Sequence, residues 1–114
     1  MKTIIFSGPT GSGITTKARL LQNEISRNSA EHYTVYAPNH TNYRNVIPRI
    51  KSGKIKTLLL DGASCATIVN FGRHLWLNKF NGVLVATTRD KDIHVDELVE
   101  THNVQIHYLH HKKD

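Results

Sequence analysis

A glycine-rich segment near the start of the chain, GPTGSGITT at residues 8–16, constrains the fold more than any other feature of the sequence. It follows a short run of β-forming residues at 3–6, and the apolar residues after it are spaced as on one face of a helix. These apolar residues are Ile14, Ala18, Leu21 and Ile25. The segment therefore predicts a strand that passes into a helix through a loop whose glycines let the backbone approach an anion closely.

The rest of the chain continues the same alternation of strand and helix patterns. Strands are expected at residues 3–6, 33–36, 57–60, 83–86 and 104–109. Helices are expected between them, at 14–25, 42–51, 64–75 and 95–99. Pro48 counts against the second helix because proline cannot donate a hydrogen bond in a helix interior, whereas Ser64 is a suitable cap for the third. Strands that alternate with helices indicate an α/β fold. We expect three layers, α/β/α, in which the middle layer is a five-stranded parallel sheet.

The strand patterns differ in how apolar they are. TIIF, TLLL and VLVA, at residues 3–6, 57–60 and 83–86, are apolar almost throughout, as strands covered on both faces must be. YTVY and VQIHYL, at 33–36 and 104–109, carry polar residues at intervals, as edge strands do. The first, third and fourth strands are therefore expected at the centre of the sheet, and the second and fifth at its edges.

Length and composition favour a single domain spanning residues 1–114. The chain has one cysteine, so it cannot form an internal disulfide. No apolar run approaches the length of a membrane span, and we therefore expect a soluble, cytoplasmic protein that does not bind a membrane.

The net charge of +6 is distributed unevenly, because Asp61 is the only acidic residue between His32 and Arg89. Cations gather in a segment that we call the basic surface: Arg44, Arg49, Lys51, Lys54 and Lys56. Three tyrosines lie in or near it: Tyr33, Tyr36 and Tyr43. Aromatic rings beside cations can stack on bases and pair with phosphates, which predicts a partner that is nucleic acid or an acidic protein. The alternative is a solvated basic face whose tyrosines pack the second strand and the following helix.

The glycine loop and a second short motif together resemble the P-loop NTPase superfamily. FSGPTGSGITT is similar to its Walker A loop, and TLLLDG, at residues 57–62, to its Walker B strand. The GPTGSG segment looks most like the loop of secretion, pilus-retraction and helicase-type ATPases. The resemblance implies a site at the carboxyl ends of the strands and, with a strand inserted between the two motif strands, the strand order 5-1-4-3-2.

The resemblance also implies roles for individual residues. The loop would bind the phosphates of a nucleotide, ATP or ADP rather than GTP, through Gly8, Pro9, Thr10, Gly11, Ser12, Gly13, Ile14, Thr15 and Thr16. Thr15 would hold Mg²⁺, and Asp61 would hold it through water, although an Asp before Gly62 is also a common turn pairing. At the end of the fourth strand, Thr87 and Arg89 are candidates to sense the terminal phosphate, with Thr88 as an alternative to Thr87.

The sequence departs from the superfamily pattern at two positions. Ile14 stands where the Walker A lysine contacts the phosphates, and a lost charge-assisted hydrogen bond of about 1.5–3 kcal/mol corresponds to about ten- to a hundredfold in affinity. Gly62 stands where many helicase- and motor-type members carry a glutamate that orients the attacking water. Three cations are candidates to replace the lysine: Lys17, Arg73 and, best placed at a strand end, Arg89. We therefore expect weak nucleotide binding with weak or absent hydrolysis.

Other interpretations stay open at this point. TTRD, at residues 87–90, has the Thr and Asp of the base-reading motif of GTPases but not its Lys, and Ser64 stands where their Walker B glycine belongs. The first alternative to nucleotide binding is a non-enzymatic scaffold that uses the basic surface to bind its partner. A lesser alternative is an active ATPase, GTPase or nucleotide kinase whose loop was altered at Ile14.

The histidines and the cysteine are weaker candidates for chemistry. His102, His107, His110 and His111 gather near the C-terminus, where a tail provides little of the fixed geometry that a metal site needs. Adventitious metal binding is the better interpretation of this cluster. Cys65 has no evident base partner in the sequence, and we expect it to be a small buried residue at a helix start.

Overall fold

Five parallel strands form the centre of the structure, a computed structural model that describes residues 1–109. The strands are β1 (Lys2–Ser7), β2 (His32–Tyr36), β3 (Thr57–Asp61), β4 (Val83–Thr88) and β5 (Asn103–Tyr108). They lie in the order β2-β3-β4-β1-β5, and every neighbouring pair is parallel. The predicted order 5-1-4-3-2 is confirmed, with β2 and β5 at the edges.

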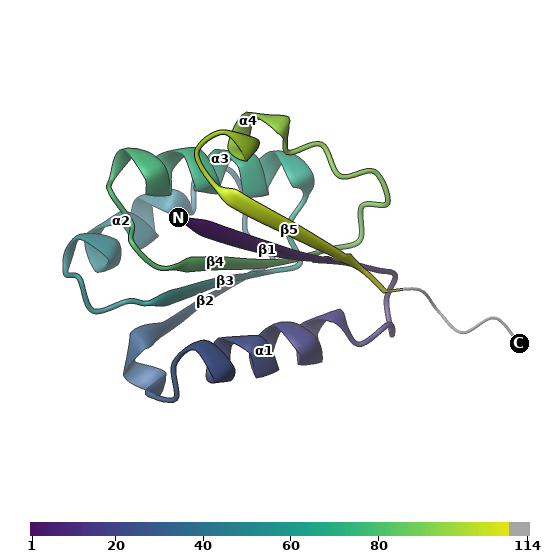
Figure 1. Cartoon of the computed structure of the whole chain (residues 1–114), viewed down its shortest axis with the longest axis horizontal. Coiled ribbons are helices and arrows are strands. Elements are labelled where there is room, and N and C mark those ends of the chain that lie inside the picture. Colours follow the sequence, from purple (N-terminus) through teal and green to yellow (C-terminus); the bar gives the residue numbers. More distant parts are fainter. Residues whose placement is uncertain (110–114) are drawn as a thin grey trace, which may run out of the picture.

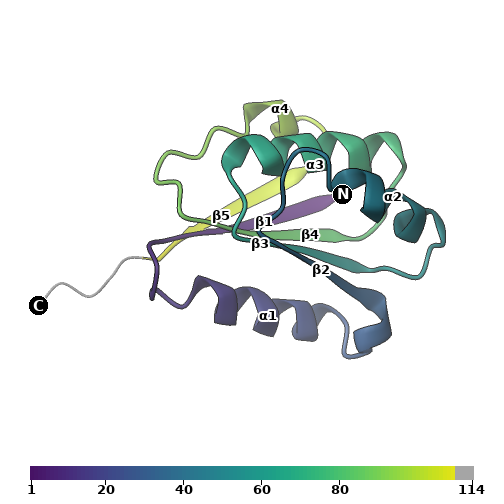
Figure 2. The same cartoon turned by 180° about the vertical axis from the view of Figure 1, so that it is seen from behind.

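Helices cover both faces of this sheet. They are α1 (Ile14–Ile25), α2 (Tyr43–Lys51), α3 (Cys65–Leu77) and the short α4 (Asp96–Val99), and a single 3-10 turn at Ser29–Glu31 leads into β2. Helix α1 lies alone on one face, and the other helices lie together on the opposite face (Figures 1 and 2). The predicted three-layer α/β/α arrangement is therefore confirmed.

The central strands alternate their side chains between two apolar clusters. Ile5 of β1 and Leu58 and Leu60 of β3 are buried on the α3 side, where they pack with residues such as Phe71. On the α1 side, residues one position away along the same strands form a second cluster: Ile4, Phe6, Leu59 and Val85, with Ala18 of α1. Burial on both faces explains why these strands are apolar almost throughout.

Ser64 precedes the first residue of α3, and Pro48 lies inside α2. Ser64 caps α3, because its hydroxyl oxygen accepts a hydrogen bond of 3.2 Å from the amide of Thr67. Helix α2 runs through Pro48, whose side chain is exposed, and Val46 and Ile50 of the same helix are buried in the core. Packing of this apolar face outweighs the hydrogen bond that proline removes.

In the part of the chain that the structure describes, no helix combines the length and the apolar character needed to cross a membrane.

Candidate functional site

The glycine loop lies at the carboxyl end of β1 and leads directly into α1. Gly11 and Gly13 have φ angles of 83° and 86°, in the left-handed region that favours glycine. Among the described residues, no side chain caps the start of α1, and its first turn holds no acidic residue. The first amides of a helix have no partner within the helix, so this end of α1 is suited to bind an anion.

Three side chains from three different elements meet beneath this loop. The hydroxyl of Thr15 in α1 donates a hydrogen bond of 3.0 Å to Oδ1 of Asp61 at the end of β3. The hydroxyl of Thr87 in β4 donates to the same oxygen at 2.8 Å and accepts from the amide of Gly62, also at 2.8 Å. Two threonines therefore fix the orientation of the Asp61 carboxylate, and Thr87 is itself buried.

A cavity of about 290 Å³ lies between the loop and these strand ends. Its walls are formed by Pro9, Thr10, Gly11, Gly13, Ile14, Thr15, Thr16, Asp61, Gly62, Thr87, Thr88 and Arg89. The structure thus brings together seven of the nine predicted loop residues with the predicted metal and sensor residues. Gly8 and Ser12 do not line the cavity; a Cβ atom on Gly8 would lie 2.5 Å from the Ser12 hydroxyl and 2.6 Å from the Leu109 carbonyl, so only glycine fits there.

Ile14 takes part in packing as well as lining the cavity. Its side chain is partly buried and packs with Leu109 against the apolar cluster that contains Phe6. Within residues 1–109, Arg89 is the only cation among the cavity-lining residues. Lys17 lines a different groove, and Arg73 on α3 pairs with Glu97 at 3.5 Å. Of the cations considered as substitutes for the lysine, Arg89 is therefore the one that reaches this cavity.

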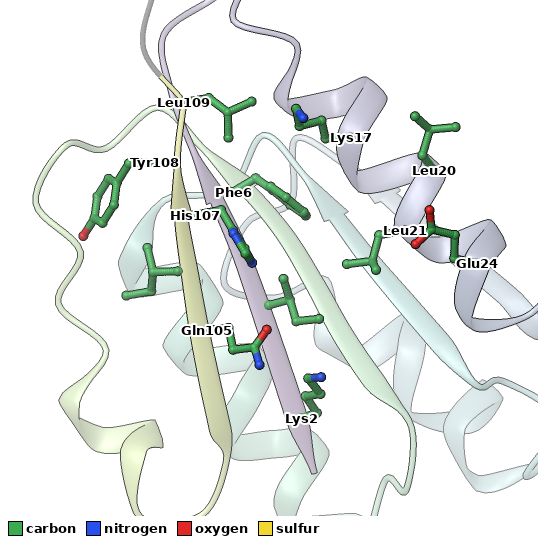
Figure 3. Close-up of a pocket in the computed structure, with 12 residues that line it drawn as sticks. Lys2, Phe6, Lys17, Leu20, Leu21, Glu24, Gln105, His107, Tyr108 and Leu109 are labelled. Carbon is green, nitrogen blue, oxygen red and sulfur yellow. The ribbon is translucent and has the colours of Figure 1, made fainter.

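A larger groove of about 880 Å³ lies on the α1 side of β1 and β5 (Figure 3). There the ring of Phe6 stacks on that of His107 with centroids 5.2 Å apart, and Leu21 of α1 lies opposite them. The groove shares no lining residue with the smaller cavity and contains neither the glycine loop nor Asp61. The features that suit a phosphate therefore belong to the smaller cavity.

The tyrosines near the basic surface are engaged by other side chains of the protein. The guanidinium of Arg49 lies 4.5 Å from the ring centroid of Tyr33. Tyr43 stacks on His74 with centroids 3.6 Å apart. Tyr36 is 64% exposed, with Arg19 at 5.8 Å from its ring centroid. The packing interpretation thus accounts for Tyr33 and Tyr43, while the cations of the basic surface remain exposed.

The described histidines do not assemble into a metal site, since no three metal-ligating side chains cluster within residues 1–109. His102 and His107 lie at opposite ends of β5, while His110 and His111 fall outside the described residues. His102 is 3% exposed, its Nδ1 lies 2.9 Å from the Thr3 hydroxyl, and burial lowers the pKa of its ring. Cys65 is the buried first residue of α3, and burial raises the pKa of its thiol.

Comparison with known proteins supports the fold. No protein-family model matches this chain, and neither does any curated protein. Among solved structures, C. elegans PCH-2 superposes with a TM-score of 0.52 and 15% identity, over 97% of this chain and 36% of PCH-2. At that identity the likeness concerns the fold alone, and it supports a P-loop-like fold for this chain. The chain spans little more than a third of the length of PCH-2.

Proposed function

We propose that this domain binds a nucleoside triphosphate or diphosphate together with Mg²⁺, preferring adenine nucleotides, and hydrolyses it slowly or not at all. The observation that carries this proposal is the pair of hydrogen bonds from Thr15 and Thr87 to Asp61 beneath the glycine loop. Mg²⁺ prefers oxygen ligands, and it usually binds through one or two carboxylates together with the phosphates of a substrate. The hydroxyl of Thr15 and the carboxylate of Asp61 fit that requirement.

The glycine loop supplies the other half of the proposed site. Its positive-φ glycines and the start of α1, which has no side-chain cap, support an arrangement in which backbone amides would bind the phosphates. Arg89 would add a charge-assisted hydrogen bond to the terminal phosphate. When bound, Mg²⁺ would neutralise phosphate charge, and Thr15 and Asp61 would hold it.

The same cavity offers little for hydrolysis. Ile14 provides no cation at the loop, and loss of one donor to the transferring group typically lowers the rate by about 10²–10³. Among the described residues, Asp61 is the only carboxylate that lines the cavity, and it would be engaged with the metal. Within residues 1–109, no second carboxylate lines the cavity to orient an attacking water.

Thermal unfolding with and without Mg²⁺ tests the proposal, using ATP, ADP and GTP at millimolar concentration. A ligand at a hundred times its Kd stabilises the folded state by about 2.7 kcal/mol, which a shift in Tm reveals readily. The Asp61→Asn variant should lose the Mg²⁺-dependent part of the shift. Asp92→Asn is the matched control, because it makes the same chemical change at an exposed position outside the cavity. Absence of a shift with all three nucleotides in the parent protein would refute the proposal.

A second candidate function is binding of nucleic acid or an acidic protein by the basic surface. In the described part of the chain, Lys56 is the only one of its five cations in an ion pair, with Glu31 at 3.8 Å. Binding of a single-stranded DNA oligonucleotide should then weaken steeply as salt is raised, with a slope of about 0.7 per phosphate contacted. Changing Arg44 and Lys51 to alanine should reduce that slope and leave any response to nucleotide unchanged.

A further inference from the structure

Arg89 lies between two residues that are each tied to other parts of the fold. On one side, the carbonyl of Thr88 accepts a hydrogen bond of 3.0 Å from the amide of Gly8, which joins the end of β4 to the glycine loop. The hydroxyl of Thr88 also accepts a hydrogen bond of 3.1 Å from the amide of Asp90, across Arg89. The backbone on either side of Arg89 is therefore closed into a tight turn.

Asp90 connects this turn to two further elements. Its carboxylate Oδ2 accepts a hydrogen bond of 2.9 Å from the amide of Cys65, the first residue of α3. Its backbone carbonyl accepts a hydrogen bond of 2.5 Å from the hydroxyl of Ser7 at the end of β1. The thiol of Cys65 adds a weaker contact of 3.6 Å to the carbonyl of Asp92. The side chain of Asp90 therefore links the loop after β4 to α3, while its backbone carbonyl links the same loop to β1.

We propose that Asp90 is a positioning residue, which anchors the loop after β4 to α3 so that Arg89 reaches the terminal phosphate of the bound nucleotide. The inference rests on the proposed function and adds to it the means of telling a triphosphate from a diphosphate. Because position 14 carries Ile and no other cation lines the cavity in the described part of the chain, contact with the terminal phosphate would depend on Arg89.

The charge of Asp90 has a partner other than Arg89. Its carboxylate faces the amino end of α3, where the helix dipole and the Cys65 amide stabilise it. Within residues 1–109, Arg89 forms no ion pair, so its guanidinium is available to a phosphate. A short hydrogen-bonded turn also reduces the backbone freedom that the segment carrying Arg89 would lose on binding.

Asp90 also helps to cap α3, so its effect on binding must be separated from its effect on stability. Ser64 provides the control, because its hydroxyl caps the same helix end through the amide of Thr67 without touching the loop that carries Arg89. Removing either cap should cost a similar amount of stability. Asp90→Asn keeps an oxygen that can accept from the Cys65 amide, and it serves as the conservative rescue.

The experiment measures Kd for MgATP and MgADP by calorimetric titration. The parent protein should prefer MgATP by about tenfold or more, as expected for one charge-assisted hydrogen bond. Arg89→Ala and Asp90→Ala should both reduce the preference to near parity, and the double variant should lose no more. Asp90→Asn and Ser64→Ala should retain it.

The outcomes separate the inference from the proposed function. A parent protein that binds neither nucleotide would refute both. A parent that binds MgATP and MgADP equally would leave the proposed function standing and refute the role of Arg89 and Asp90. Retention of the preference in Asp90→Ala, or an equal loss in Ser64→Ala, would show that Asp90 acts only as a helix cap.

Discussion

The substitution Ile14→Lys should change stability and nucleotide affinity in opposite directions. Ile14 is partly buried and packs against the cluster around Phe6. Full burial of such a side chain is worth about 1.5–3 kcal/mol, and a lysine stem recovers part of it, so a loss of about 1 kcal/mol is expected for this half-buried position. For a domain of this size the loss corresponds to a Tm lower by about 4–8 °C.

Affinity for MgATP should rise at the same time. The new ammonium would extend into the cavity beside Thr15 and Arg89, where a charge-assisted hydrogen bond to phosphate contributes about 1.5–3 kcal/mol. That gain corresponds to about ten- to a hundredfold in Kd. The Tm of the variant, lower without ligand, should therefore rise more steeply with MgATP and overtake that of the parent.

The assay is thermal unfolding of both proteins over a series of MgATP concentrations, with Ile14→Met as the uncharged control of similar length. The methionine variant should bind as the parent does. A lysine variant that binds no tighter than the methionine variant would contradict the reasoning, because position 14 would then lie outside the reach of the phosphates.

Three further perturbations test the packing around the site. Thr87→Val removes the hydrogen bond to the site carboxylate and should lower the free energy of unfolding by about 1.5–3 kcal/mol in urea titrations, and no change would show that the bond is unimportant. Burial keeps the pKa of His102 below its ordinary value, so the unfolded chain binds the proton more readily and stability should be lost as the pH falls below about 6.5. His102→Gln should flatten that pH dependence. Gly72→Ala places a Cβ 2.8 Å from a Leu98 methyl and should destabilise by about 1–3 kcal/mol in the same titrations.

Much of the fold could be predicted because the relevant signals are local. The runs TLLL and VLVA belong to central strands, and a strand covered on both faces favours apolar side chains along most of its length. The strand order came from the resemblance of the two motifs and not from hydrophobic patterning. Pro48 is an exception to local rules. The helix forms around it because Val46 and Ile50 of the same helix are buried in the core.

The candidate site was predictable where its residues follow a motif. The loop and Asp61 are recognisable from spacing within short segments, and the structure places Thr15 and Asp61 within hydrogen-bond distance. The packing of Ile14 and Leu109 against one apolar cluster and the contact of Asp90 with Cys65 lie beyond the sequence predictions. These contacts join residues far apart in the sequence, and the local sequence pattern does not indicate which distant residues come together at the ends of the strands.

A lysine introduced at position 14 should not by itself produce hydrolysis. Gly62, which follows the site carboxylate, has a φ angle of 82°, in the left-handed region. A glutamate at this position would have open space around its Cβ, but it would be strained by about 1–3 kcal/mol because of the backbone angle. A carboxylate at position 62 would therefore require a different backbone conformation there, whereas a cation at position 14 requires only a different side chain. On this basis the Ile14→Lys protein should bind MgATP more tightly and still turn it over at no more than a trace rate.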